Sequence, residues 1–212
     1  MALFLFSVIV IFVTMYVLNS GINTLQRLEV VESERDQWQR PLDILRALDL
    51  REGNTVVDLG SGAGYFALKL SPAVGKRGKV LAVDIRRLSL TFLWARALLR
   101  GQHNLHAILG EEDNPHLPIG AADVVLICNT YHEFNNPELM LNHVSRSLRP
   151  GGHLVVVDRA PRAIEAEHVH GISLTVVEKE IRQKGFKIIS QDDHFIDQPR
   201  DDLWWLLIAR KP

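Results

Sequence analysis

The chain has 212 residues, of which 47% are hydrophobic and 23% are charged. Its 24 lysines and arginines nearly balance its 25 aspartates and glutamates, which leaves a formal net charge of −1. Proteins that hold nucleic acid by neutralising phosphates normally carry a basic excess, so we expect no nucleic-acid partner. The single cysteine, Cys128, excludes an internal disulfide and a cysteine-rich zinc module.

The first predicted element is apolar on all sides. Residues 2–18 contain only Ser7 and Thr14 as clearly polar side chains. As a helix this stretch rises about 26 Å, and extension to Ile22 brings it to the roughly 30 Å of bilayer hydrocarbon. We predict a transmembrane anchor over residues 1–23. The alternatives are a cleaved signal peptide, which normally has a basic start and a small-residue cleavage site, and a buried helix, which is normally striped.

The charges around this segment predict its orientation. Arg27, Arg35 and Arg40 follow the span, and no lysine or arginine precedes it. Basic residues concentrate on the cytoplasmic side of membrane spans. We therefore expect a single-pass membrane protein with its N-terminus outside and the remaining chain on the cytoplasmic side. Residues 24–37 are predicted to form a helical neck or linker.

Residues 38–212 alternate between strand and helix patterns. Asn136 before Pro137 predicts a helix start, Pro150-Gly151-Gly152 a helix stop, and Ser173 a cap for the last helix. This alternation is typical of an α/β domain with a parallel sheet and helices on both faces. Strands are predicted at 55–59, 79–84, 104–109, 122–128, 153–158, 186–190 and 203–209, helices at 42–48, 65–71, 88–100, 137–148 and 173–185, and a connection at 192–202.

A glycine-rich turn, DLGSGAGYF at 58–66, follows the first predicted strand. Glycines at 60 and 62 permit a tight turn and close approach of a ligand, and the next helix offers unpaired N–H groups. Tyr65 occupies the place of the third glycine in the dinucleotide fingerprint, which disfavours a nicotinamide cofactor. The loop lacks the Gly-Lys-Ser/Thr ending of an ATP-binding P-loop, which excludes that class.

Three acidic residues at or just after the ends of the first three predicted strands indicate which ligand the turn would bind. Asp58 precedes the first glycine by two residues, where a carboxylate would repel a pyrophosphate but suit a cationic group. Asp84 ends the second strand, where a carboxylate can accept from both hydroxyls of a ribose. Glu111, in the acidic turn 110–113, could accept from an adenine amino group. Together these features describe a nucleoside with a cationic arm and no phosphates, namely S-adenosylmethionine.

These motifs resemble those of the class I S-adenosylmethionine-dependent methyltransferases. The resemblance rests on 58–66, AVDI at 82–85, the acidic turn and SLRPGGHLVVVD at 147–158, and it spans residues 38–212. It is greatest for the bacterial small-molecule type, whose fourth strand ends in a motif like NTYHEF at 129–134. The resemblance implies a Rossmann-like sheet of seven strands, with the antiparallel last strand inserted beside the fifth.

The resemblance also implies the site residues. The glycine turn would hold the methionine end, Asp84 the ribose, and Ile85 would pack on the adenine or in the core. Trp38-Gln39-Arg40 would cover the cofactor, unless Trp38 anchors at the membrane interface. The implied cofactor-binding residues are Asp58, Gly60, Ser61, Gly62, Gly64, Tyr65, Asp84, Ile85, Glu111 and Asn129.

Two residues after the fourth strand are candidates for catalysis. His132 could act as a general base near neutral pH, or it could shape the site. A base is not obligatory, because methyl transfer from a sulfonium often needs only proximity and alignment. Tyr131 could line the acceptor pocket, contact the cationic sulfur or pack in the core. His168 and His170 form a pair without evident further ligands, so we expect no metal site.

The sequence therefore predicts a membrane-anchored methyltransferase that transfers a methyl group to a small or lipophilic acceptor by in-line displacement. Its partners would be that acceptor and the lipid bilayer, through residues 1–23. Two alternatives stay open: a non-catalytic module that binds S-adenosylmethionine for a structural or regulatory purpose, and a nicotinamide-dependent oxidoreductase. The acceptor atom and the oligomeric state are not specified by the sequence.

Overall fold

The computed structural model describes residues 2–161, 171–198 and 202–212. The chain separates into two compact units, Met1–Gln37 and Trp38–Pro212, each with its own internal contacts. Each unit is described by itself below.

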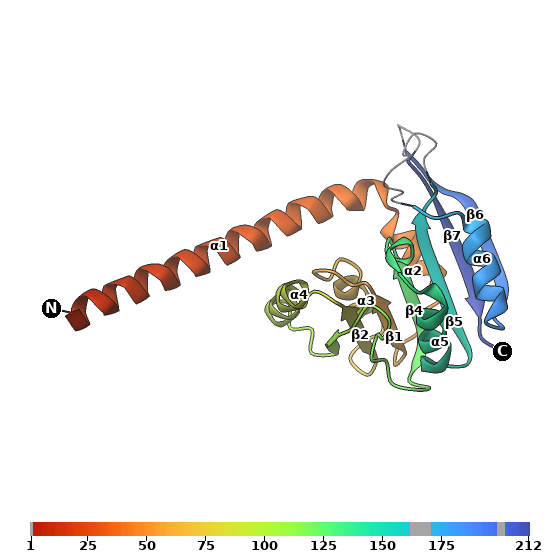
Figure 1. Ribbon diagram of the computed structural model, residues 1–212, viewed down its shortest axis with the longest axis horizontal. Coiled ribbons are helices and arrows are strands. Elements are labelled where there is room, and N and C mark those ends of the chain that lie inside the picture. The colour runs from red at the N-terminus through yellow and green to blue at the C-terminus, as the bar shows by residue number, and fades with distance from the viewer. Residues whose placement is uncertain (1, 162–170, 199–201) are drawn as a thin grey trace. The chain divides into compact units, whose positions relative to one another are not determined.

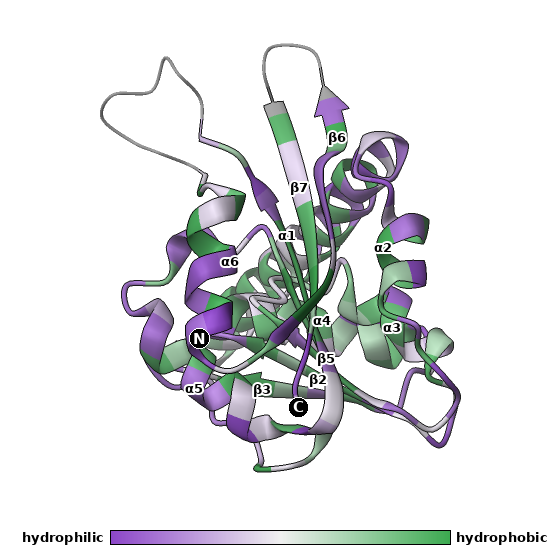
Figure 2. Cartoon of the chain, turned by 90° about the vertical axis from the view of Figure 1, so that its right-hand side faces the viewer, coloured by the Kyte–Doolittle hydropathy of each residue, from purple (hydrophilic) through white to green (hydrophobic). Residues whose placement is uncertain are grey.

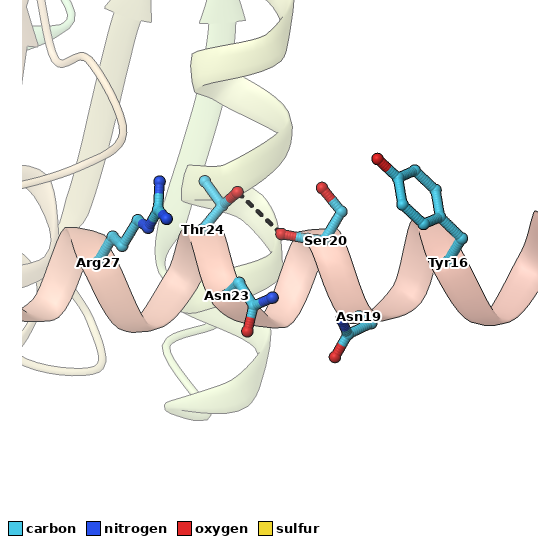
Figure 3. A pocket seen from close by; sticks show the side chains of 6 residues that line it. All are labelled: Tyr16, Asn19, Ser20, Asn23, Thr24 and Arg27. Carbon is cyan, nitrogen blue, oxygen red and sulfur yellow. Dashed lines mark hydrogen bonds between the residues drawn. The ribbon is translucent and has the colours of Figure 1, made fainter.

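The first unit consists of one helix. Helix α1 (Ala2–Trp38) runs for 37 residues without a break, so the expected neck at 24–37 continues the same helix (Figure 1). Its segment Ile9–Trp38 is long and apolar enough to cross a membrane, by length and composition alone. Polar side chains begin near its middle, where the Thr24 hydroxyl donates to the Ser20 carbonyl at 2.9 Å. A shallow hollow there is lined by Tyr16, Asn19, Ser20, Asn23, Thr24 and Arg27 (Figure 3).

The second unit is built on a seven-stranded sheet in the order β3-β2-β1-β4-β5-β7-β6. Strands β1 to β5 pair in parallel, whereas β7 runs antiparallel between β5 and β6. This is the predicted methyltransferase topology. The strands are β1 (Thr55–Leu59), β2 (Lys79–Asp84), β3 (Leu105–Leu109), β4 (Ala122–Cys128), β5 (Leu148–Arg159), β6 (Lys187–Gln198) and β7 (Asp202–Arg210).

Helices cover both faces of the sheet. Successive strand residues alternate between the faces, so Val56 and Val57 belong to opposite hydrophobic clusters. Burial on both faces explains why the central strands are continuously apolar. Figure 2 shows that α5 and α6, by contrast, carry both hydrophobic and hydrophilic residues. Helices α2 (Pro41–Ala47), α3 (Ala67–Ala73) and α4 (Arg87–Leu99) contribute to one cluster, and α5 (Pro137–Ser147) and α6 (Leu174–Gln183) to the other.

The helix caps follow the sequence only in part. The Asn136 side chain accepts a hydrogen bond from the Leu139 N–H at 3.1 Å, which confirms the predicted start of α5. Ser173 does occupy the N-cap position of α6, but its hydroxyl makes no capping hydrogen bond. It lies 3.1 Å from the Thr175 hydroxyl instead. Two neighbouring hydroxyls satisfy each other there, so the backbone donor loses its side-chain partner.

Two predicted boundaries are wrong. Helix α5 ends at Ser147, and residues 150–152 lie inside β5, where its register with β4 shifts. The expected connection at 192–202 is largely strand, because β6 continues to Gln198 along β7. Residues 192–194 have exposed side chains, as polar residues of an edge strand can. This run of polar residues is why the sequence predicted a loop at this place instead of a strand.

Candidate cofactor and active site

The glycine-rich turn lies where the strand order of the sheet reverses. Strand β1 pairs with β2 on one side and with β4 on the other, so the turn follows β1 at a topological switch point. Ligands of open α/β sheets bind beside the carboxyl ends of strands at such points. The backbone N–H groups of Gly60 and Ser61 both donate to the Val83 carbonyl at 2.9 Å. Strand β2 thereby fixes the start of the turn.

Asp84 ties the turn to the end of β2. Its carboxylate is 5% exposed, and Oδ2 accepts from the Gly62 N–H at 2.8 Å. Oδ1 accepts from the Arg86 N–H at 2.8 Å. Oδ1 also accepts from the Arg86 Nε at 3.3 Å. Each carboxylate oxygen has about two acceptor positions, so Oδ2 retains one for a ribose hydroxyl.

Two glycines of the turn serve different purposes. Gly60 has φ +82°, and a Cβ added there would overlap the Thr130 side chain. Gly62 has φ +54°, and a Cβ added there would meet no atom within 4 Å. Gly60 is therefore required by packing. At Gly62 no protein atom covers the backbone where a Cβ would stand, so a ligand can approach it there.

The residues of the turn fit S-adenosylmethionine. The Ser61 hydroxyl oxygen is buried, and it has no hydrogen-bond partner among the described residues. Buried polar groups in native proteins nearly always have a partner, so a ligand group is the natural complement of this hydroxyl. Asp58 is 2% exposed and brings a carboxylate to the same strand end, which suits a cationic arm rather than a phosphate.

The residues predicted to contact the adenine follow the neighbouring strands β2 and β3. Ile85 follows β2 and is 55% exposed, so its side chain is available for packing against a base. The Gly110 N–H donates to the Asp84 carbonyl at 3.0 Å, which places the acidic turn next to Asp84. Glu111 is exposed there, 3.3 Å from the His116 imidazole. Tyr65, in contrast, is buried and packs edge-on against Phe66.

Asn129 and His132 connect the ends of β4 and β5. Asn129 has φ 54°, its N–H donates to the Val157 carbonyl at 2.8 Å, and its Oδ1 accepts from Arg159 at 3.1 Å. The His132 Nδ1 lies 2.8 Å from Asp158 Oδ1. The two strand ends are therefore joined by side chains as well as by the sheet.

Asp158 is a functional candidate that the sequence alone did not identify. It is fully buried, and its Oδ2 also accepts from the His132 backbone N–H at 3.2 Å. A carboxylate at Nδ1 favours the tautomer with its proton on that nitrogen, which leaves Nε2 as a proton acceptor. Its position at the end of HLVVVD, at the carboxyl edge of the sheet, was the available signal.

Tyr131 lies in a different environment. It is fully buried, and its hydroxyl donates to Glu180 of α6 at 2.6 Å. Burial, followed by the neighbouring Glu180 carboxylate, raises the pKa of the Tyr131 phenol well above its usual range. This contact favours core packing between the sheet and α6 over contact with a cationic sulfur.

The segment Trp38-Gln39-Arg40 lies over the carboxyl end of β4. The Gln39 side chain is buried, and its amide nitrogen lies 3.6 Å from the Cys128 sulfur. The Trp38 ring lies 5.6 Å from the Trp204 ring at the start of β7. The predicted cover therefore reaches the same sheet edge as the glycine turn. His168 and His170 lie outside the described residues.

The comparisons with known proteins agree with this geometry. A family model described as a methyltransferase domain matches residues 50–198, which is more than half of the chain. The chain therefore belongs to this methyltransferase family, and with its fold this makes it a class I S-adenosylmethionine-dependent methyltransferase. The antiparallel β7 also sets the sheet apart from a dinucleotide-binding one.

Two relatives illustrate the extent of the similarity. A ubiquinone/menaquinone biosynthesis C-methyltransferase of Azotobacter vinelandii is 32% identical over 110 residues, 51% of this chain and 44% of that protein. The chain thus spans less than half of the length of this relative. A SAM-dependent methyltransferase structure from Aquifex aeolicus matches 89% of this chain and 98% of its own, with 22% identity and a TM-score of 0.75.

A third comparison includes the cofactor. Phosphoethanolamine N-methyltransferase 2 of Haemonchus contortus, in complex with S-adenosyl-L-methionine, matches 82% of this chain and 53% of its own with a TM-score of 0.71. Its identity to this chain is 15%, so the likeness concerns the fold. S-adenosylmethionine is the cofactor of this family, and the glycine turn with Asp84 is the part of this chain that fits it.

We expect Asp84→Ala to weaken S-adenosylmethionine binding by roughly tenfold to a hundredfold, because charged hydrogen bonds to the ribose are lost. Titration calorimetry of the full chain in detergent measures this change. Asp193→Ala, which removes an exposed carboxylate of β6, serves as the matched control and should bind normally. Equal affinity of both variants would show that Asp84 does not hold the cofactor.

Proposed function

We propose that the protein methylates a small, lipophilic acceptor that it meets at the membrane to which α1 anchors it. The observation that carries this proposal is the combination, in one chain, of a methyltransferase domain with a helix whose apolar side chains remain exposed. Phe12 and Val17, for example, are 71% and 61% exposed. Such a surface costs free energy in water and is stabilised in a bilayer. A tether also raises the local concentration of the site for acceptors dissolved in lipid.

The residues of the site would divide the work between binding and proton transfer. S-adenosylmethionine supplies, when bound, an electrophilic methyl group suited to in-line displacement by the acceptor. The glycine turn and Asp84 would hold the nucleoside, and Asp58 would lie toward its cationic arm. His132, held by Asp158, would take a proton from the acceptor through Nε2. Exclusion of water by Trp38-Gln39-Arg40 would protect these contacts.

The relatives suggest which acceptors to try first. Several curated matches, from Azotobacter vinelandii, Coxiella burnetii and Vibrio vulnificus, are described as ubiquinone/menaquinone biosynthesis C-methyltransferases. Quinone precursors are small and lipophilic, so they satisfy the class of acceptor that an anchored site favours. We therefore propose an aromatic ring of this kind as the first candidate substrate.

Incubation of the full chain with methyl-labelled S-adenosylmethionine and membrane extract should place label in the organic-soluble lipid fraction. Addition of demethylated quinone precursors should increase that label if the ring is the acceptor. The Asp84→Ala variant serves as the control for cofactor-dependent labelling. Label found only on soluble proteins would contradict a lipophilic acceptor.

The anchor can be tested through its apolar centre. We expect Val10→Arg to release part of the protein from alkali-washed membranes, because a charge near the centre of a span costs about 2.5–3.5 kcal/mol. Val30→Arg, at an exposed position of the same helix beyond the proposed anchor 1–23, should be retained. The orientation is tested separately, by adding protease to the outside of intact spheroplasts. The C-terminal domain should stay intact. Digestion of that domain by the external protease would show the opposite orientation.

The role of His132 predicts a separation of kinetic parameters. His132→Gln should lower kcat by about 10²- to 10⁴-fold, because a positioned base is lost, while S-adenosylmethionine affinity is unchanged. His106→Gln, on an exposed position of β3, is the matched control. Unchanged kcat in His132→Gln would show that proximity alone suffices and that His132 only shapes the site.

A further inference from the structure

Helix α4 has an apolar face that is exposed, in addition to its buried one. Its inner side contributes Leu90, Leu93 and Ala97 to the core. Its outward-facing apolar side chains are large, with exposed fractions of 68% for Leu88, 61% for Trp94, 55% for Leu98 and 76% for Leu99. At helical spacing, positions 88, 94, 98 and 99 fall within one half of the circumference. We define these four residues as the outer face of α4.

The charged residues of the segment that carries the outer face are all basic. Residues 85–110 contain four arginines and no aspartate or glutamate. Arg86, Arg87 and Arg100 are exposed, whereas Arg96 is buried. A helix surface of tryptophan and leucine bordered by arginine is typical of segments that lie in the interface of an anionic membrane. Asp84, whose carboxylate lies 3.3 Å from the Arg86 Nε, is buried, so a partner docking on residues 85–110 would meet basic side chains.

The inner side of α4 contacts the cofactor turn. The buried Arg96 guanidinium donates to the Ala63 carbonyl at 2.7 Å, and a Cβ added at Gly64 would overlap Leu93. The helix therefore has the glycine turn on one side and the outer face on the other. A surface that binds lipid through α4 would bring the cofactor turn within one helix diameter, about 10–12 Å, of that surface.

We propose that the outer face of α4 docks on an anionic lipid bilayer and places the cofactor site at its surface. This proposal rests on the proposed function, because it supplies the route by which a lipophilic acceptor reaches the site. It differs from the anchoring by α1, since the four side chains would lie in the headgroup region and would not span the membrane. The arginines provide the attraction to anionic headgroups, and the leucines and Trp94 provide the burial.

Nitroxide labelling of the full chain tests this docking directly. Leu98→Cys and, as matched control, Ile119→Cys each place a label at an exposed apolar position, and Ile119 lies in the loop before β4. The native Cys128 is buried, and the unsubstituted chain gives its background labelling. Collision with oxygen, which enriches in lipid, is compared with collision with a nickel chelate, which stays in water. The vesicles contain phosphatidylcholine alone or mixed with phosphatidylglycerol.

Docking predicts a severalfold higher oxygen-to-nickel ratio at position 98 than at position 119, with a further rise when phosphatidylglycerol is present. Arg87→Glu should remove most of that rise, whereas Arg77→Glu, a reversal at an exposed arginine outside residues 85–110, should not. Equal ratios at positions 98 and 119 in both vesicles would overturn the proposal. Spin–spin broadening at position 98 that replaces the lipid signal would also overturn it, and would show a second copy on this face.

The outcome does not depend on methyl transfer, so it is separable from the proposed function. A chain that floats with phosphatidylcholine vesicles but leaves position 98 in water keeps the anchor and contradicts docking. A chain that fails to float with phosphatidylcholine but buries position 98 in phosphatidylglycerol vesicles supports docking and contradicts the anchor. Lack of labelled product in the extract assay would contradict the acceptor class without changing either result.

Discussion

The parallel pairing of β1 with both β2 and β4 is the constraint on which the site depends. Because the chain leaves β1 between two parallel neighbours, its next residues must turn at the carboxyl edge of the sheet. The Val83 carbonyl then binds two backbone N–H groups of the turn, and the Asp84 carboxylate binds a third. The conformation of the cofactor turn is therefore fixed largely by β2. A ligand meets a preformed backbone and does not have to order it.

The same edge collects side chains from distant parts of the sequence. Asn129 and His132 follow β4, and their partners Arg159 and Asp158 end β5, 30 and 26 residues later in the chain. Parallel pairing brings such residues together because the carboxyl ends of neighbouring strands lie side by side. This explains why the glycine turn could be predicted from spacing, whereas the His132–Asp158 pair could not. The turn is local in sequence, but the pair depends on the register of two strands.

The elements that were predicted well are those whose signals are local. Strands β1, β2 and β4 each have a run of apolar residues because both faces are covered. Asn136-Pro137 marks a helix start through backbone chemistry alone. The failures have a tertiary origin. Strand β6 lies at the edge of the sheet, where exposed residues 192–194 carry no inward alternation. Tyr131 follows β4 like His132, but its hydroxyl donates to Glu180 of α6, and its ring packs in the same hydrophobic cluster as that helix.

Helix α4 shows how a regular helix can conceal a functional surface in its sequence. Apolar residues on both its buried and its exposed sides cancel the stripe by which an amphipathic helix is recognised. Leu90 and Leu98 look equivalent in the sequence, yet one is 8% and the other 55% exposed. Only the packing of α4 against the sheet separates core leucines from surface leucines. The sequence alone shows that residues 85–110 contain no acidic residue. This points to a lipid-binding surface only when the structure shows that the arginines border an exposed apolar face.

The selectivity of the enzyme for its acceptor must come from outside the shared sheet. Structures of the same fold include a phosphoethanolamine N-methyltransferase, an arsenic(III) methyltransferase and a [4+2]-cyclase, so the common strands do not determine the acceptor. In this chain the parts outside the strands that lie near the carboxyl ends of β4 and β5 include the cover at 38–40 and the segment at 129–134. The cover is also the point where α1 ends, so the polar second half of that helix leads into the cover. The anchor that we propose and the cover therefore belong to one continuous stretch of chain, and a membrane-dissolved acceptor would make use of both.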